Sequence, residues 1–425
     1  RLLPEEIEKR SFEIISEELC KRGITLPKEE EMITKRVIHT SADFEYADTM
    51  TYAKDAIAIA KELLRNGADI VTDTNMAKAG INKNSLKKFG GEAYCFIADE
   101  DVAKEAKERA DLRTTLLEIN KLAAKYFYAQ LKSQNGKIAY DYLKRRELSD
   151  ETILGFGLGY SNKYSNDLHK YLKAKGYSDE LIMKAGLANV DEKTGIYDKF
   201  WNRVMFPIMD VNNKVIGFGG RVLGEGTPKY LNSPETLLFD KSRNLYGLQL
   251  AKKSKRKGII FCEGYMDVIS MHQAGFNNAV ASLGTALTSQ QASLLKRYTE
   301  EVLIIYDSDE AGRKAALRAI PLLKAAGLNT KVIDLKPYKD PDEFIKAMGK
   351  EAFQERLDRG MNSFLFEIKA QEDQYDMNDP QGKTDFFKET AQKLLRFEDE
   401  IERNNYMQAV AESYRIPVEN LRKMV

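Results

Sequence analysis

The fold of the chain is decided by GIIFCE (residues 258–263), a short apolar run that ends in a carboxylate, and by VLIIYDSD (residues 302–309), which repeats that pattern. Both runs have the length and composition of strands that are buried on both faces. Helical patterns follow them, over 265–273 and 311–326, and a further strand is predicted over 329–333. Strands and helices that alternate in this way predict a compact α/β domain with a parallel sheet.

Carboxylates stand at the ends of these three predicted strands. Glu263 follows the first, Asp307 and Asp309 follow the second, and Asp340 and Asp342 follow the third after a short loop. Ligands of open α/β sheets bind at the carboxyl ends of the strands, and Mg²⁺ prefers oxygen ligands. A lone D-x-D is most often a solvated turn, but three acidic strand ends in order predict a site for Mg²⁺ or Mn²⁺.

The composition limits the classes of function. A length of 425 residues suggests roughly two to four domains. Lys and Arg number 66 against 65 Asp and Glu, so a nucleic-acid-binding protein would have to gather its positive charge locally. The three cysteines form no CxxC pair, which predicts neither a structural zinc site nor disulfides. Since no run of 18 apolar residues occurs, we expect no membrane span and a cytoplasmic protein.

The rest of the chain is predicted to flank the α/β domain with other kinds of structure. A long amphipathic helix over 112–131 opens a mixed region with a hairpin signal at Asn212-Asn213, and the chain after Pro341 is predicted to be all helical. Residues 1–110 read as a separate, short α/β segment. Its predicted elements are helix 4–22, strand 36–40, helix 52–65, strand 68–72, helix 74–79, strand 93–98 and helix 101–110.

Two acidic motifs, FCEGYMD (261–267) and YDSDEAG (306–312), resemble the TOPRIM fold, which primases, type IA and type II topoisomerases and some nucleases share. Further motifs resemble those of bacterial DnaG-type primases, in the same order and spacing. These motifs are GGRVL (219–223), PKYLNSPET (228–236), FDK (239–241), SLGTA (282–286) and KDPDE (339–343). The resemblance extends from about residue 112 to residue 425.

The resemblance implies an α/β fold that is α+β overall. A TOPRIM parallel-sheet domain over 243–345 would lie between a basic α+β subdomain over 111–242 and a helical C-terminal subdomain over 346–425. A partial Rossmann-like α/β segment over 1–110 would precede them.

Residue roles also follow from the resemblance. The implied catalytic and metal-binding residues are Glu263, Asp307 and Asp309, with Asp267, Asp340 and Asp342 as supporting acids. The implied nucleotide- and template-binding residues are Arg146, Arg221, Lys229, Tyr230, Asn232, Lys241, Gly284 and Thr285. Lys and Arg would neutralise phosphates, and an aromatic ring beside them could stack on a base.

The activity implied is the synthesis of short RNA primers from NTPs on a single-stranded DNA template, with Mg²⁺ or Mn²⁺ and without zinc. Members of the family also carry a zinc-binding domain and a helicase-binding domain, and work with a replicative helicase and single-strand-binding protein. We find no counterpart of either domain in the sequence up to Val425, and we expect a monomeric core. Two alternatives remain open: a TOPRIM nuclease or topoisomerase, and a non-catalytic core that binds single-stranded DNA.

The first hundred residues carry a different resemblance. RVIHTSADF (36–44) and IVTDTNMAKAGI (70–81) are similar to precorrin-8X methylmutase, an isomerase of cobalamin biosynthesis. The resemblance implies that His39 corresponds to the acid of a methyl migration. The family's domain is about twice as long as this segment, so we interpret residues 1–108 as a truncated fragment fused to the primase-like core. Methylmutase activity is a further alternative, and His39 is expected to be a vestigial acid.

Overall fold

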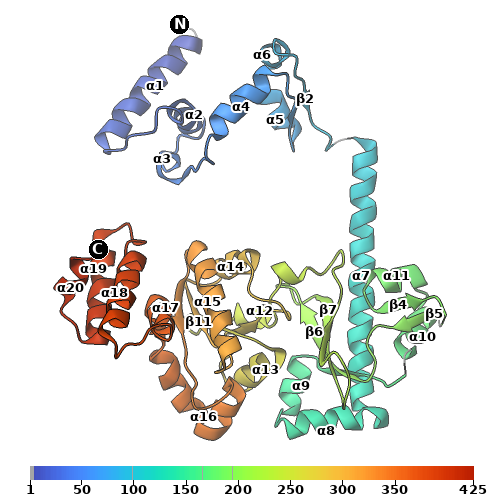
Figure 1. Ribbon diagram of the computed structural model, residues 1–425. Helices are drawn as coiled ribbons and strands as arrows, with labels where there is room; N and C mark the ends of the chain where they lie inside the picture. The colour runs from blue at the N-terminus through green and yellow to red at the C-terminus, as the bar shows by residue number, and fades with distance from the viewer. Residues whose placement is uncertain (1–3, 98, 165, 194) are drawn as a thin grey trace. The chain divides into compact units, whose positions relative to one another are not determined.

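The computed structural model describes residues 4–97, 99–164, 166–193 and 195–425. The chain divides into two compact units, Arg1–Ala110 and Asp111–Val425. Helix α7 (Glu100–Lys132) begins in the first unit and continues into the second (Figure 1). Sequence analysis predicted two helices here, but one continuous helix runs through the boundary, with residues 100–111 exposed.

The first unit begins with two helices, and the second of them corrects a prediction. Residues 36–40 were expected to form a strand, but they lie within helix α2 (Glu31–Ser41). The β-branched side chains there favour a strand only weakly, and tertiary packing overrides that preference. Ile38 is buried against Ile15 of helix α1 (Pro4–Lys21), which gives this segment an apolar helical face.

The remainder of the first unit contains a two-stranded parallel sheet, in which Ile70 pairs with Ala93. The strands are shorter than the predicted 68–72 and 93–98, and Ala98 lies outside the described residues. Val71 is 64% exposed, so the first of these strands is open on one face. The elements are α3 (Tyr46–Thr49), α4 (Ala56–Arg65), β1 (Ile70–Val71), α5 (Asn75–Gly80), α6 (Lys83–Lys87) and β2 (Ala93–Tyr94).

The second unit opens with the buried half of α7, whose Leu116, Ile119 and Phe127 are in the main core. An antiparallel sheet of order β3-β6-β7-β8 packs in the same core. The predicted turn at Asn212-Asn213 joins β6 to β7, with Asp210 accepting hydrogen bonds from the backbone of Asn212 and Lys214. The strands are β3 (Gly159–Ser161), β6 (Arg203–Met209), β7 (Val215–Val222) and β8 (Tyr230–Asn232), with a separate hairpin of β4 (Ala188–Asp191) and β5 (Gly195–Asp198).

Short helices complete this part of the unit. They are the 3₁₀ turns η1 (Gln134–Gly136) and η2 (Lys241–Arg243), and the helices α8 (Lys137–Arg145), α9 (Asp150–Gly155), α10 (Asp167–Ala174), α11 (Asp179–Lys184) and α12 (Leu248–Ala251).

A five-stranded sheet of order β10-β9-β11-β12-β13 forms the centre of the unit. Four of its strands are parallel, in agreement with the predicted parallel sheet: β9 (Ile259–Cys262), β10 (Ala279–Ala281), β11 (Glu301–Ile304) and β12 (Asn329–Val332). The fifth, β13 (Met361–Asn362), pairs antiparallel with β12. The sequence after Pro341 was predicted to be all helical, and this two-residue strand is too short for a periodic pattern to show.

Alternate residues of β9 pack on opposite sides of the sheet. Ile260 and Cys262 belong to the main core, whereas Ile259 and Phe261 belong to a second core with α14 and α15. Both faces are therefore covered, as is usual for parallel sheets. The helices around it are α13 (Tyr265–Gln273), α14 (Ser289–Lys296), α15 (Glu310–Ala325) and α16 (Pro341–Asp358).

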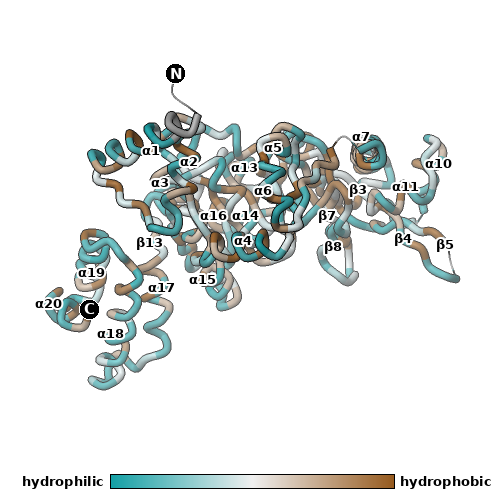
Figure 2. Tube along the Cα trace, turned by 90° about the horizontal axis from the view of Figure 1, so that it is seen from above, coloured by the Kyte–Doolittle hydropathy of each residue, from teal (hydrophilic) through white to brown (hydrophobic). Residues whose placement is uncertain are grey.

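The C-terminal helices have a core of their own, in which Phe386, Met407 and Val410 are buried. Figure 2 shows these helices as largely hydrophilic along the tube, whereas hydrophobic stretches gather around β3 and β7. Within the described ranges, no helix has both the length and the apolar character needed to cross a membrane. The helices are α17 (Ser363–Glu372), α18 (Pro380–Leu394), α19 (Glu400–Tyr414) and α20 (Val418–Arg422).

Candidate active site

Glu263 and Asp307 follow adjacent parallel strands, β9 and β11, and meet at their carboxyl ends. Glu263 Oε1 accepts a hydrogen bond from the backbone N–H of Asp307 at 3.2 Å. Burial raises the pKa of Glu263 above its ordinary value, and repulsion from Asp307 and Asp309 adds to the shift. These two strand ends therefore form one acidic site, as the sequence predicted.

Asp307 is the most centrally placed carboxylate of this group. Burial raises its pKa, the neighbouring Asp340 and Asp309 raise it further, and the positive charges of Lys339 and Lys229 lower it. Lys339 Nζ lies 3.9 Å from Asp307 Oδ2. The positive charge of Lys229 thus lowers the pKa of Asp307, which connects the predicted basic motif to the acidic site.

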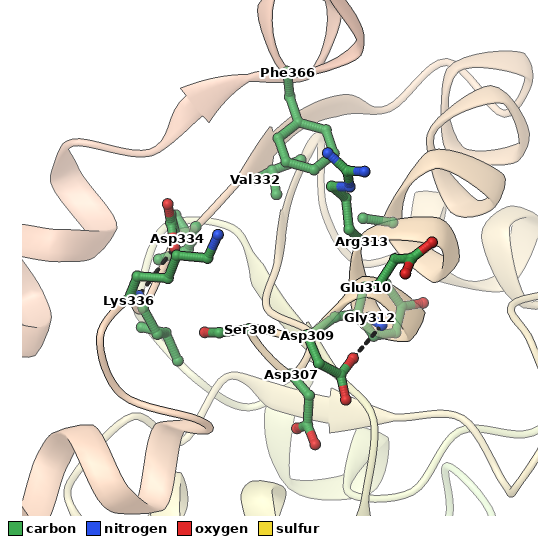
Figure 3. Close-up of a pocket in the computed structure, with 14 residues that line it drawn as sticks. Asp307, Ser308, Asp309, Glu310, Gly312, Arg313, Val332, Asp334, Lys336 and Phe366 are labelled. Atoms are coloured by element: carbon green, nitrogen blue, oxygen red, sulfur yellow. Dashed lines mark hydrogen bonds between the residues drawn. The ribbon is translucent and has the colours of Figure 1, made fainter. Parts of the chain in front are cut away.

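Asp309 has a structural task besides any chemistry. It is the N-cap of α15, and its Oδ1 accepts a hydrogen bond from the backbone N–H of Gly312 at 2.8 Å (Figure 3). A Cβ at Gly312 would lie 2.0 Å from the backbone oxygen of Asp307. The turn from β11 into α15 can thus close only around a glycine.

Asp267 lies in the first turn of α13, four residues after Glu263. Its Oδ2 accepts a hydrogen bond from the backbone N–H of Gly264 at 3.1 Å. Burial raises the pKa of Asp267 to about 7, with contributions from Asp340 and Asp307. The carboxyl group therefore faces the same acidic site.

The two aspartates of the third acidic motif, Asp340 and Asp342, have different roles. Asp340 is the N-cap of α16 and accepts a hydrogen bond from the backbone N–H of Glu343 at 2.9 Å. It also raises the pKa of Asp267 and Asp307, so it belongs to the acidic site. Asp342, by contrast, is engaged in ion pairs, with Arg146 at 3.0 Å and with Lys346 at 3.1 Å.

Two loops at this edge of the sheet are joined by Ser308. Its backbone N–H donates to the oxygen of Lys339 at 3.0 Å, and its hydroxyl donates to the oxygen of Tyr338 at 2.8 Å. The loop after β11 therefore holds the loop after β12 in register. No role of Ser308 was predicted, because nothing in the motif distinguishes a tethering serine from a solvated one.

Aromatic and basic side chains face the acids from the antiparallel sheet. Burial raises the pKa of Tyr230 to about 12, and its electrostatic neighbours are Tyr142, Arg221, Asp267 and Arg146. The Arg221 guanidinium lies 4.5 Å from the centroid of the Tyr142 ring. Sequence analysis missed Tyr142, which lies on α8 outside every motif.

Asn232 connects the antiparallel sheet to the loop after β10. It accepts a hydrogen bond from the hydroxyl of Tyr265 at 2.7 Å and donates one to the oxygen of Leu283 at 2.8 Å. Gly284 follows with a φ of 72°, and a Cβ there would lie 3.0 Å from the Asn232 amide nitrogen. The predicted Gly284 and Asn232 are thus brought into contact, and Thr285 beside them is exposed.

Lys241 lies on η2, and both its backbone N–H and its backbone oxygen form hydrogen bonds. Its N–H donates to Glu235 at 3.1 Å, and its oxygen accepts from Gln291 at 2.9 Å. The pKa of Lys199 is lowered mainly by burial and further by the positive charge of Lys241. Lys199 is a second cation of this region that no motif indicated.

His39, the predicted vestigial acid, lies in the first unit. Its Nδ1 is 2.7 Å from the Ser11 hydroxyl, and its ring meets that of Phe12 edge-on at 5.7 Å. It is on helix α2, not beside a strand as the sequence suggested.

A cavity of about 300 Å³ adjoins the acidic site. Figure 3 shows Asp307, Asp309 and Ser308 along one side, with Phe366 and Arg313 beyond them and Asp334 and Lys336 on the opposite wall. In the part of the chain that the structure describes, no three His, Cys, Asp or Glu side chains are already arranged as a metal-binding group. The acids share one edge of the sheet without forming a closed ligand shell.

Four family models match successive parts of the chain. "Precorrin-8X methylmutase" matches residues 6–129 and "DNA primase catalytic core, N-terminal domain" matches residues 126–252. "Toprim-like" matches residues 260–345, and "DnaB-helicase binding domain of primase" matches residues 364–419. The first two matches overlap on helix α7. The last match corrects our prediction that no helicase-binding counterpart is present; a short helical segment of this kind carries no motif that we could recognise.

Relatives and solved structures agree with these matches. The chain is 42% identical over 326 residues to the DNA primase of Clostridium acetobutylicum, covering 76% of this chain and 54% of that protein. It therefore spans about half the length of the curated relatives it matches. Among solved structures it resembles a "DnaG primase catalytic domain bound to ssDNA", with 35% identity, a TM-score of 0.63, and 71% of this chain and 99% of that one covered. The RNA polymerase domain of Mycobacterium tuberculosis DnaG, in complex with double-stranded DNA that has a 6-nucleotide overhang, matches with 31% identity and a TM-score of 0.64, covering 70% of this chain and 97% of that one.

Proposed function

The chain belongs to the DnaG-type primases, and we propose that its residues 111–425 add ribonucleotides to a growing RNA primer on a single-stranded DNA template. The observation that carries this proposal is the meeting of Glu263 and Asp307 at one edge of the sheet, with Lys339 Nζ 3.9 Å from Asp307 and the charge of Lys229 also lowering the Asp307 pKa. A carboxylate cluster beside cations can bind a metal ion and a nucleotide triphosphate together. As a replication enzyme, it would act in the cytoplasm.

Glu263, Asp307 and Asp309 would hold the divalent ion, with Asp267 and Asp340 as supporting acids. Burial raises the pKa of Glu263 and of Asp307, and repulsion from neighbouring aspartates adds to both shifts, so the site favours a bound cation. Mg²⁺ usually binds through one or two carboxylates, waters and substrate phosphates, so it needs no ready-made protein shell. When bound, the ion would activate the attacking 3′ oxygen and neutralise the pyrophosphate.

The basic side chains would bind the phosphates of the substrates. Lys229 and Lys241 would neutralise the triphosphate, and Arg221 and Arg146 would contact the template backbone. Tyr230, whose pKa is influenced by both arginines, offers a ring on which a base can stack. The resemblance to a catalytic domain bound to single-stranded DNA supports this choice of template.

We also infer a helicase contact for residues 364–419, from the family model that they match. Leu395 and Ile401 are 52% and 73% exposed and flank the turn between α18 and α19. Large apolar residues this exposed are candidates for a protein contact. Replacing both with Glu should weaken capture of a replicative helicase, while ribonucleotide incorporation without helicase stays unchanged. Unaltered capture would place the contact elsewhere.

The first unit is proposed to take no part in this chemistry. The match of residues 6–129 to precorrin-8X methylmutase makes corrin isomerisation a second candidate. The parallel sheet has strands of only two residues, and Val71 is exposed. Such a sheet provides little surface to line a corrin-binding pocket. We infer a fused fragment, and turnover of a precorrin substrate by the chain, lost in His39→Ala, would overturn this view.

The proposed function is tested by ribonucleotide incorporation on a single-stranded oligonucleotide, with Mg²⁺ or Mn²⁺ and with chelator. A TOPRIM nuclease would instead shorten the labelled oligonucleotide in the presence of metal. A non-catalytic binding core would leave both the oligonucleotide and the NTPs unchanged. The three results are distinct on one gel.

A further inference from the structure

We propose that Asp342 is a positioning residue, which holds Arg146 in place for the template strand, and is not a ligand of the metal ion. The inference rests on the proposed function and concerns the third acidic motif, KDPDE. In this motif Asp340 faces the acidic site, whereas Asp342 is turned to the cations of α8 and α16.

Asp342 is nearly buried, with 9% of its side chain exposed. A buried carboxylate is costly unless positive charge and hydrogen bonds compensate it. Here one oxygen, Oδ2, accepts from Arg146 Nη2 at 3.0 Å and from Lys346 Nζ at 3.1 Å. Two fixed positive charges already offset this carboxylate, and they would repel a divalent cation placed beside it.

The same contacts join two distant parts of the chain. Arg146 caps the C-terminus of α8, and Lys346 Nζ also lies 3.3 Å from the Arg146 backbone oxygen and 3.5 Å from Glu147 Oε2. Residues 146 and 342 are 196 positions apart. Asp342 therefore fixes the end of α8 against the first turn of α16, two residues after the acidic Asp340.

Arg146 retains the capacity to bind a phosphate. Its side chain is 37% exposed, and its positive charge lowers the pKa of Tyr230. Its Nε is buried without a hydrogen-bond partner, so the guanidinium orientation depends on the remaining nitrogens. A planar guanidinium binds phosphate well only when its orientation is held. Asp342 supplies that restraint.

The test compares Asp342→Asn, Arg146→Ala and the double variant in the full chain. Binding of a fluorescein-labelled single-stranded DNA oligonucleotide is followed by anisotropy over a range of KCl, without metal or NTP. One lost phosphate contact lowers the slope of log affinity against log salt by about 0.7. We expect this loss in each single variant and no further loss in the double variant, because both changes remove the same contact.

Two further variants separate positioning from a general effect of charge or stability. Asp342→Glu keeps the charge and should restore most of the slope, which folding alone would not explain. Asp150→Asn removes an aspartate that also lies near two cations, Lys132 at 3.8 Å and Lys144 at 3.9 Å, but that is exposed. This control should keep the wild-type slope.

A metal titration distinguishes a positioning role of Asp342 from a role as a metal ligand. In ribonucleotide incorporation, Asp307→Asn should raise the half-activating Mg²⁺ concentration at least about tenfold, whereas Asp342→Asn should leave it unchanged. A raised Mg²⁺ requirement in Asp342→Asn with an unchanged salt slope would overturn the inference. If the wild-type chain incorporates nothing, the proposed function fails, but the salt slopes still decide the role of Asp342.

Discussion

Glu263 Oε1 accepts a hydrogen bond from the backbone N–H of Asp307 at 3.2 Å, which joins the carboxyl ends of strands β9 and β11. The pair brings together two carboxyl groups whose pKa values are both raised by burial. A cation between them would relieve their repulsion.

The first prediction concerns metal binding and pH. Mg²⁺ or Mn²⁺ at about 100 times its dissociation constant should stabilise the fold by about 2.7 kcal/mol at pH 8. At pH 6 the stabilisation should be smaller, because protons compete for Glu263 and Asp307, whose pKa values are raised, and for Asp267, whose pKa is about 7. Thermal melting with metal and with chelator measures both values. Equal shifts at the two pH values would contradict the assigned site.

The second prediction concerns Asp267 in the presence of chelator. Its pKa is raised from 3.8 to about 7 in the folded protein, so the folded state holds this proton more tightly than the unfolded state. The contribution is favourable at acidic pH and is lost as the pH rises from about 4 to about 7. Asp267→Asn keeps an acceptor for Gly264 and should raise stability by about 1–2 kcal/mol at pH 8, but not at pH 4. Urea denaturation at both pH values measures this, and a loss at pH 8 would refute it.

The third prediction separates chemistry from helix capping at Asp309. Asp309→Ala removes both the carboxylate and the cap of α15, whereas Asp309→Asn keeps an oxygen for the Gly312 N–H. We expect both variants to lose incorporation at least about 100-fold, and only the Ala variant to lose about 1 kcal/mol of stability.

Asp379 provides the matched control for this experiment. It caps α18 in the same way, accepting from the Gly382 N–H at 2.8 Å, away from the acidic site. Asp379→Ala should cost similar stability and leave incorporation intact. An active Asp309→Asn variant would show that Asp309 serves only as a cap.

The fourth prediction concerns the glycine of the YDSDEAG motif. A Cβ at Gly312 would lie 2.0 Å from the Asp307 backbone oxygen, so Gly312→Ala must displace the loop that carries Asp307 and Asp309. Overpacking of this kind costs about 1–3 kcal/mol. We expect lower thermal stability and strongly reduced incorporation. Gly155→Ala is the control, since no atom lies within 4 Å of a Cβ there, and a Gly312→Ala protein that behaves like it would show that the loop has room.

The parallel sheet and its acidic edge could be predicted from the sequence because their signals are local. Strands β9 and β11 lie in apolar runs, and Glu263 and Asp307 directly follow these runs. Strand order and register then place both carboxylates at one edge. The residues of the basic motifs were predicted from resemblance, not from any pattern of charge.

The remaining features depend on contacts that no local pattern contains. Ile38 lies in a helix because it packs against α1, although its neighbours favour a strand. The ion pair of Arg146 and Asp342 joins positions 196 residues apart. The role of Tyr142 becomes visible only in the structure, where the Arg221 guanidinium lies over its ring. Composition also suggested two helices at the boundary near residue 110, where one helix continues.

We propose that residues 111–425 form a nucleotide-adding site on Glu263, Asp307 and Asp309. It is tested most directly by incubating the chain with labelled NTPs and a single-stranded DNA template in Mn²⁺, and comparing Asp307→Asn. We expect short RNA products from the wild-type chain, none with chelator, and at least about 100-fold less from the variant. RNA synthesis by Asp307→Asn at the wild-type rate would contradict it.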